Sequence, residues 1–183
     1  MEKNLPGLLA GLLLVLTALP LQASSQTPYS GQQHRDIKAL SANDIDGYLQ
    51  GRGMGMAKAA ELNHYPGPKH VLELVKPLGL TSEQRQLTQA LFNRMKQNAS
   101  SLGQSLVEKE RELNQLFVSG EINSARLDTV LAEIGTLQAK LRYVHLGTHL
   151  EQKRILSDEQ VSLYDDLRGY GSGQSHHGNH HEH

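Results

Sequence analysis

The sequence predicts an all-α protein built on a long antiparallel helical hairpin with shorter flanking helices. Two long segments carry leucine-rich apolar stripes at three-, four- and seven-residue steps, which is the period of an amphipathic helix. Two near-identical motifs, at 80–84 and 156–160, read Leu-(Thr/Ser)-x-x-Gln and predict helix starts with a capping box. The chain has two Phe, six Tyr and no Trp, which suits leucine-rich helix pairing because such pairing needs few large aromatic residues.

The first 23 residues have the pattern of an export signal. Lys3 precedes an apolar run at 8–16, and Ala23 offers a small residue for cleavage. The run is shorter than the roughly 20 apolar residues that a spanning helix needs. We therefore expect cleavage after about Ala23 and a periplasmic protein, with an uncleaved N-terminal anchor as the alternative. Residues 24–40 are polar and predict a flexible leader.

The helical domain is expected over 41–170. Ser41 and Asp44 form an N-cap pattern that predicts a first helix over 42–62. Glycines at 47, 51, 53 and 55 weaken this helix, because each costs about 1 kcal/mol against alanine. They either let another backbone approach closely or mark a break near Arg52. The prolines at 66 and 68 then require a sharp turn, and a short helix is expected over 69–75.

The hairpin is predicted from two apolar stripes separated by a short turn. One helix should run over 81–118 and the next over 124–154, with the turn at 119–121 making them antiparallel neighbours. A short fourth helix is expected over 158–167. The first long helix would span about 57 Å at 1.5 Å per residue. One stripe per helix cannot be fully buried within such a hairpin, so we expect an intertwined homodimer.

Composition excludes several functions. A net charge of −1 offers no electrostatic attraction for nucleic acid. The absence of cysteine removes thiolate metal ligands and thiol catalysis, although it leaves the compartment open. The sequence shows no nucleophile–base pattern, so we expect no enzyme activity.

Histidines are the candidate metal ligands at the end of the chain. Residues 171–183 are expected to form a disordered Gly/Ser/His-rich tail, and imidazole is a common ligand for Zn, Ni, Cu and Co. The interrupted pattern differs from a run of six histidines, yet a tail without a role and an expression tag are alternatives. The tail ligands would be His176, His177, His180, His181 and His183.

A second candidate site lies on the predicted helix 124–154. His145 and His149 are four residues apart, so both rings can point the same way and chelate one ion. Two ordinary half-buried histidines are the alternative. His70 or Glu61 could supply a further ligand by folding back onto this helix. Any bound metal would be divalent Zn, Ni, Co or Cu, and folding would not require it.

Taken together, these motifs resemble the periplasmic Spy/CpxP proteins and the related ZraP/CnrX-type heavy-metal-resistance proteins. The resemblance covers about 40–170, and the segments 51–63, 65–68 and 70–74 look like a subgroup of periplasmic heavy-metal sensors. It implies a small all-helical homodimer without enzyme activity. His145-x-x-x-His149 matches the His-x-x-x-Met ligand pair of the sensor type, with imidazole in place of thioether. The N-terminal His-x-x-x-His pair of that type is missing here.

The resemblance implies two functions. The first is a periplasmic metal-binding protein of envelope stress or heavy-metal resistance, which senses or buffers divalent metal and signals to a membrane sensor kinase or an anti-sigma factor. The alternative is an ATP-independent chaperone, or holdase, that shields unfolded client proteins. Nucleic acid is not an expected partner.

Overall fold

The computed structural model describes residues 27–171. The predicted export signal and the five tail histidines lie outside these residues. The chain divides into two compact units, 1–33 and 34–183, and a short 3-10 helix, η1 (Gln32–His34), occurs near the division. All the α-helices that the structure describes belong to the second unit.

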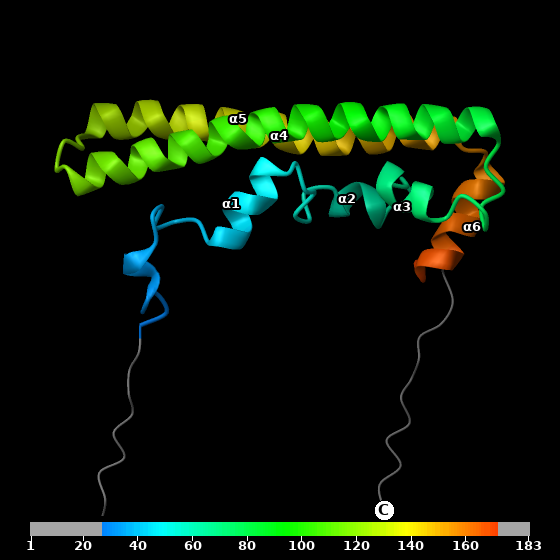
Figure 1. Cartoon of the computed structure of the whole chain (residues 1–183), viewed down its shortest axis with the longest axis horizontal. Coiled ribbons are helices and arrows are strands. Elements are labelled where there is room, and N and C mark those ends of the chain that lie inside the picture. The colour runs from blue at the N-terminus through cyan, green and yellow to red at the C-terminus, as the bar shows by residue number, and fades with distance from the viewer. Residues whose placement is uncertain (1–26, 172–183) are drawn as a thin grey trace, which may run out of the picture. The chain divides into compact units, whose positions relative to one another are not determined.

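The second unit is all-helical, as predicted. Its helices are α1 (Ala42–Leu49), α2 (Lys58–Glu61), α3 (Pro68–Glu73), α4 (Ser82–Val118), α5 (Ser124–Ile155) and α6 (Asp158–Arg168). Figure 1 shows α4 and α5 as an antiparallel hairpin, with α1, α2 and α3 following one another along one side of it. None of the helices in 27–171 is both long enough and apolar enough to span a membrane.

The two long helices confirm the predicted hairpin. Their shared core includes Leu106, Ile134 and Leu141, each at most 5% exposed. The turn between them contains Gly120, which adopts a φ of 71°, and Asn123 caps α5 by accepting from the backbone N–H of Arg126. Other stripe residues, such as Leu102 and Leu137, are partly buried against this core. Leu87, Phe117 and Leu131 are exposed.

The predicted continuous helix over 42–62 is wrong, and the alternative of a break near Arg52 is confirmed. Helix α1 ends at Leu49, and Gly51 adopts a φ of 62°, a left-handed conformation that favours glycine. A Cβ at this position would also lie 2.7 Å from the carbonyl oxygen of Lys96. The chain therefore leaves the helical path where it meets α4.

Ile37, in the predicted leader, is buried at 1% exposure.

The repeated motif joins the starts of α4 and α6. Thr81 and Ser157 each cap their helix, and Gln84 and Gln160 complete both capping boxes. The two glutamine side chains also bond to each other, with Nε2 of Gln84 2.8 Å from Oε1 of Gln160 and the reverse pair at 3.1 Å. Gln84 Nε2 further donates to the carbonyl of Ile155 at 2.9 Å. The two copies of the motif therefore contact each other directly.

Replacing Gln84 with alanine is expected to lower the free energy of unfolding by about 2 kcal/mol, because partly buried partners lose their hydrogen bonds. Chemical unfolding followed by circular dichroism measures this loss. Gln89→Ala is the matched control, since Gln89 is exposed and bonds only to Asn93, and it should change stability by less than about 0.5 kcal/mol. Equal effects of the two substitutions would contradict a structural role for the glutamine pair.

Candidate metal centre

Four of the predicted site residues line one cavity. The cavity has a volume of about 490 Å³ and lies between the segment 50–70 and the hairpin. Glu61 and His70 reach it from α2 and α3, while His145 and His149 reach it from α5. The four-residue spacing on α5 therefore does place both imidazoles at the same cavity, as the sequence predicts.

The turn after α2 brings the two sides together. Pro68 begins α3 at its first helical position, where the missing N–H costs nothing. Gly67 precedes it at a closely packed point, because a Cβ there would lie 2.8 Å from Cε1 of His149 and 3.3 Å from Oε2 of Glu61. Its φ of −90° is open to any residue, so close approach alone accounts for glycine.

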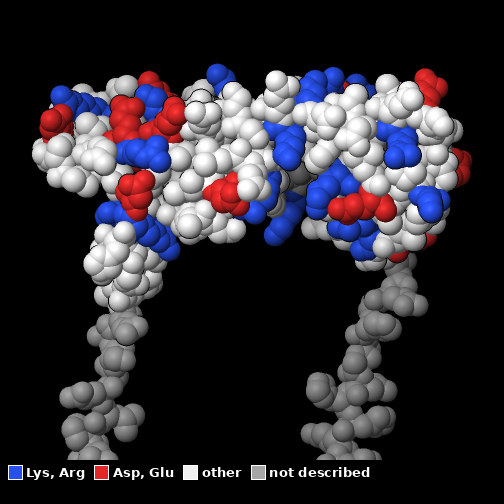
Figure 2. Space-filling model, in the orientation of Figure 1, with Lys and Arg blue, Asp and Glu red and all other residues white. Residues whose placement is uncertain are grey.

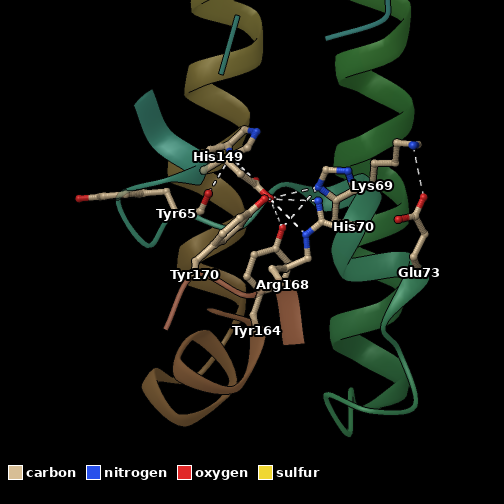
Figure 3. Close-up of polar contacts among 9 residues, drawn as sticks. Tyr65, Lys69, His70, Glu73, His149, Tyr164, Arg168 and Tyr170 are labelled. Atoms are coloured by element: carbon tan, nitrogen blue, oxygen red, sulfur yellow. Dashed lines mark hydrogen bonds and ion pairs between the residues drawn. The ribbon is translucent and has the colours of Figure 1, made fainter. Parts of the chain in front are cut away.

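One oxygen of the Glu61 carboxylate is held by a network that reaches α6 (Figure 3). Oε1 accepts from the Tyr164 hydroxyl at 2.5 Å and lies 3.2 Å from Nδ1 of His70. Nε of Arg168 is 3.7 Å away. Tyr164 is fully buried. Burial, followed by the bond to Glu61, raises the pKa of Tyr164 well above its ordinary value, which keeps the hydroxyl a hydrogen-bond donor.

The other oxygen of Glu61 is buried and has no hydrogen-bond partner. Its nearest ionic contact is Nδ1 of His149 at 3.7 Å. That same Nδ1 lies 2.7 Å from the backbone carbonyl of Tyr65, which requires it to carry the proton. The lone pair of His149 is therefore on Nε2, the arrangement in which a backbone carbonyl commonly orients a metal-binding histidine.

His145 is the most buried of these histidines, at 4% exposure. Its Nε2 has no hydrogen-bond partner. Burial, with a smaller contribution from nearby His149, lowers the pKa of His145 below its ordinary value of 6.5. The ring is therefore neutral at pH 7, the form in which imidazole binds metals.

The lowered pKa of His145 predicts acid sensitivity of the metal-free protein. The unfolded chain takes up a proton at this residue as the pH falls through 6.5, whereas the folded chain resists it, so the free energy of unfolding must fall below that pH. Unfolding curves at pH 7.5, 6.5 and 5.5 measure how steeply the free energy of unfolding falls with pH. This dependence should be weaker in His145→Gln, and an unchanged dependence would contradict a buried neutral ring.

The residues have the chemistry of a metal site, but their donor atoms do not converge on one point. Imidazole nitrogen and carboxylate oxygen suit Zn, Ni, Co and Cu(II), and two of the lining residues carry a buried atom without a hydrogen-bond partner. Within 27–171, however, no group of three or more His, Asp or Glu is arranged to hold an ion. Binding would therefore require side-chain rotations that bring His145 and Glu61 toward His149.

Sequence reasoning named His70 as a possible ligand but missed Tyr164 and Arg168, which contact Glu61. Tyr164 is 103 positions away along the chain and His70 contacts its hydroxyl at 3.4 Å. His64 lies in the same region but bonds to Asp165 at 2.6 Å instead. No local pattern marks these pairings, because α6 meets the loop only through the tertiary fold.

Fold and site together define a helical-hairpin protein with a cavity lined by histidines and one glutamate. A family model for heavy-metal resistance matches residues 52–161, and the chain belongs to that family. The family is one of non-catalytic resistance and sensor proteins that typically act outside the cytoplasm. Comparisons with curated proteins and with solved structures find no match.

Proposed function

We propose that this protein binds a divalent metal in the periplasm and thereby senses or buffers it during envelope stress or heavy-metal exposure. The observation that carries the proposal is a pair of buried atoms, Nε2 of His145 and Oε2 of Glu61, that have no hydrogen-bond partner and belong to residues lining one cavity. An unsatisfied buried polar group costs about 1–3 kcal/mol. A metal ion would satisfy both groups at once.

The supporting contacts have the form of an outer ligand shell. Tyr164, Arg168 and His70 all meet Oε1 of Glu61, which leaves Oε2 for an ion. The Tyr65 carbonyl accepts from Nδ1 of His149 and thereby leaves Nε2 for an ion. We assign His145, His149 and Glu61 as the ligands, with His70 as an outer partner. Such outer contacts orient ligands and typically change metal affinity by about 10–100-fold when removed.

The test is calorimetric titration of zinc and nickel into the purified chain with its five tail histidines replaced by asparagine. We expect one ion per core site with micromolar or tighter affinity. The double variant His145→Ala/His149→Ala should lose this binding. No binding to the tail-substituted chain, or binding unaffected by the double substitution, would overturn the core site.

We also propose that the protein is a homodimer whose partner covers exposed apolar side chains of the hairpin. Phe117 and Leu131 are 58% and 48% exposed, and isolated hairpins seldom leave such stripes uncovered. Light scattering on the purified protein measures the molar mass and so tests whether it is a dimer.

A membrane sensor kinase or an anti-sigma factor is the signalling partner that we propose for the metal-bound form. Crosslinking in the envelope tests this partner.

The same exposed apolar surface favours one alternative function, that of a holdase for unfolded clients. Phe117 and Val118 at the hairpin tip are more than half exposed, and exposed apolar patches bind other apolar chains. Suppression of client aggregation by the metal-free protein would support this function. Failure to suppress it at an equimolar ratio would exclude it.

A further inference from the structure

The cavity that holds the histidines is also lined by basic side chains. Arg52, Lys58, Lys69 and Lys96 border it, and Glu61 is the one carboxylate among its described lining residues. Figure 2 shows Lys and Arg side chains gathered around a hollow in the face that contains α1, α2 and α3. Low-dielectric walls focus the electric field of these positive charges, so the cavity attracts anions.

Two of these basic groups are neutralised by neighbours and two are not. Arg52 pairs with Asp46 at 2.8 Å, and Lys69 pairs with Glu73 at 3.3 Å, pointing toward it in Figure 3. Lys58 and Lys96 have no ion-pair partner within 34–171. The Glu61 carboxylate, whose Oε1 is engaged by Tyr164 and Arg168, supplies one negative charge against the two lysines, so the cavity lining keeps a net positive charge.

The size and walls of the cavity indicate the kind of anion. A volume of about 490 Å³ falls in the range of about 300–1,000 Å³ typical of pockets for small organic molecules, and an inorganic oxyanion would leave most of it empty. Met54, Phe92 and Met95 supply apolar wall. The fitting ligand therefore has a carbon skeleton as well as negative charge.

We propose that this cavity binds a small organic anion with two or more carboxylates, paired with Lys58 and Lys96. This inference goes beyond the proposed metal function and does not depend on it, because the lysines attract an anion whether or not a metal is present. Both lysines are exposed, so their ion pairs with a carboxylate are open to counterions and binding should weaken with salt.

The experiment is calorimetric titration of citrate into the tail-substituted chain after metal removal on a chelating resin, at low ionic strength. Citrate should bind at one site per chain, and the double variant Lys58→Gln/Lys96→Gln should weaken it by at least about tenfold. The matched control Lys76→Gln/Lys140→Gln removes the same charge outside the cavity and should leave citrate affinity within about twofold.

Sulfate and phosphate distinguish an organic ligand from a general oxyanion site, and they should bind at least about tenfold more weakly than citrate. No citrate binding, equal losses in the two double variants, or equal binding of sulfate and citrate would each overturn the proposal. The variant Lys58→Gln/Lys96→Gln should lose citrate binding while keeping zinc binding, because neither lysine is an assigned metal ligand, which keeps the failure of one proposal distinct from failure of the other.

Discussion

Replacing His145 with leucine is expected to stabilise the metal-free protein while abolishing its response to zinc. The ring is 4% exposed and its Nε2 is unpartnered, so an apolar side chain of similar size removes a desolvation cost. The gain in the free energy of unfolding should be about 1–2 kcal/mol. Loss of a ligand should reduce zinc affinity by more than about a hundredfold, beyond the effect of an outer contact.

Urea unfolding of the tail-substituted chain, with and without zinc, measures both effects. The free energy of unfolding of the parent should rise with zinc through mass action. That of His145→Leu should be higher than the parent's without zinc and should not rise further when zinc is added. His64→Leu is the control, because His64 is a histidine outside the cavity lining that pairs with Asp165. It should lose stability and keep the zinc response. A destabilised His145→Leu that still responds to zinc would contradict both the burial argument and the ligand assignment.

Substitutions at Tyr164 are expected to separate the contribution of its buried ring from the contribution of its hydroxyl. The side chain is fully buried in a core with Val71, Leu78 and Val161, so Tyr164→Ala should cost about 3–5 kcal/mol. Tyr164→Phe keeps the ring and removes only the donor to Glu61, at a cost of about 1–3 kcal/mol. It should also weaken zinc binding by about tenfold or more, since Glu61 loses its orienting contact.

Thermal unfolding and zinc titration of both variants give the two readouts. Tyr143, which is 74% exposed on α5, supplies the matched control, and Tyr143→Phe should change neither. A Tyr164→Phe protein with reduced stability and unchanged zinc affinity would show that the hydroxyl supports the fold alone. Because Tyr164 belongs to α6, a loss of zinc affinity would also establish that α6 contributes to the metal site.

Much of the fold was predictable because its signals are local. The apolar period at 81–118 and 124–154, the capping pattern at Thr81 and Ser157, and the short turn at 119–121 each depend on residues within a few positions of one another. The structure reproduces these helices to within two residues. The first helix failed as a continuous element because its break depends on Gly51 meeting α4, a long-range contact that propensity does not describe.

Of the candidate site, only the shared helical face of two histidines was predictable from local pattern. The i,i+4 spacing of His145 and His149 follows from helix geometry alone, and their position at one cavity agrees with it. The pairing of Gln84 with Gln160, by contrast, was visible only as a repeated motif, and its meaning needed the two helix starts to be adjacent.

By itself the sequence determined that this chain forms a capped helical hairpin with two histidines on one helical face, because helix period and capping are set by neighbouring residues. Only the tertiary structure decided that Glu61 is held by Tyr164 and Arg168, that Nε2 of His145 is buried without a partner, and that Lys58 and Lys96 border the same cavity. These properties arise from burial and from contacts between residues far apart in the chain, which local pattern cannot encode.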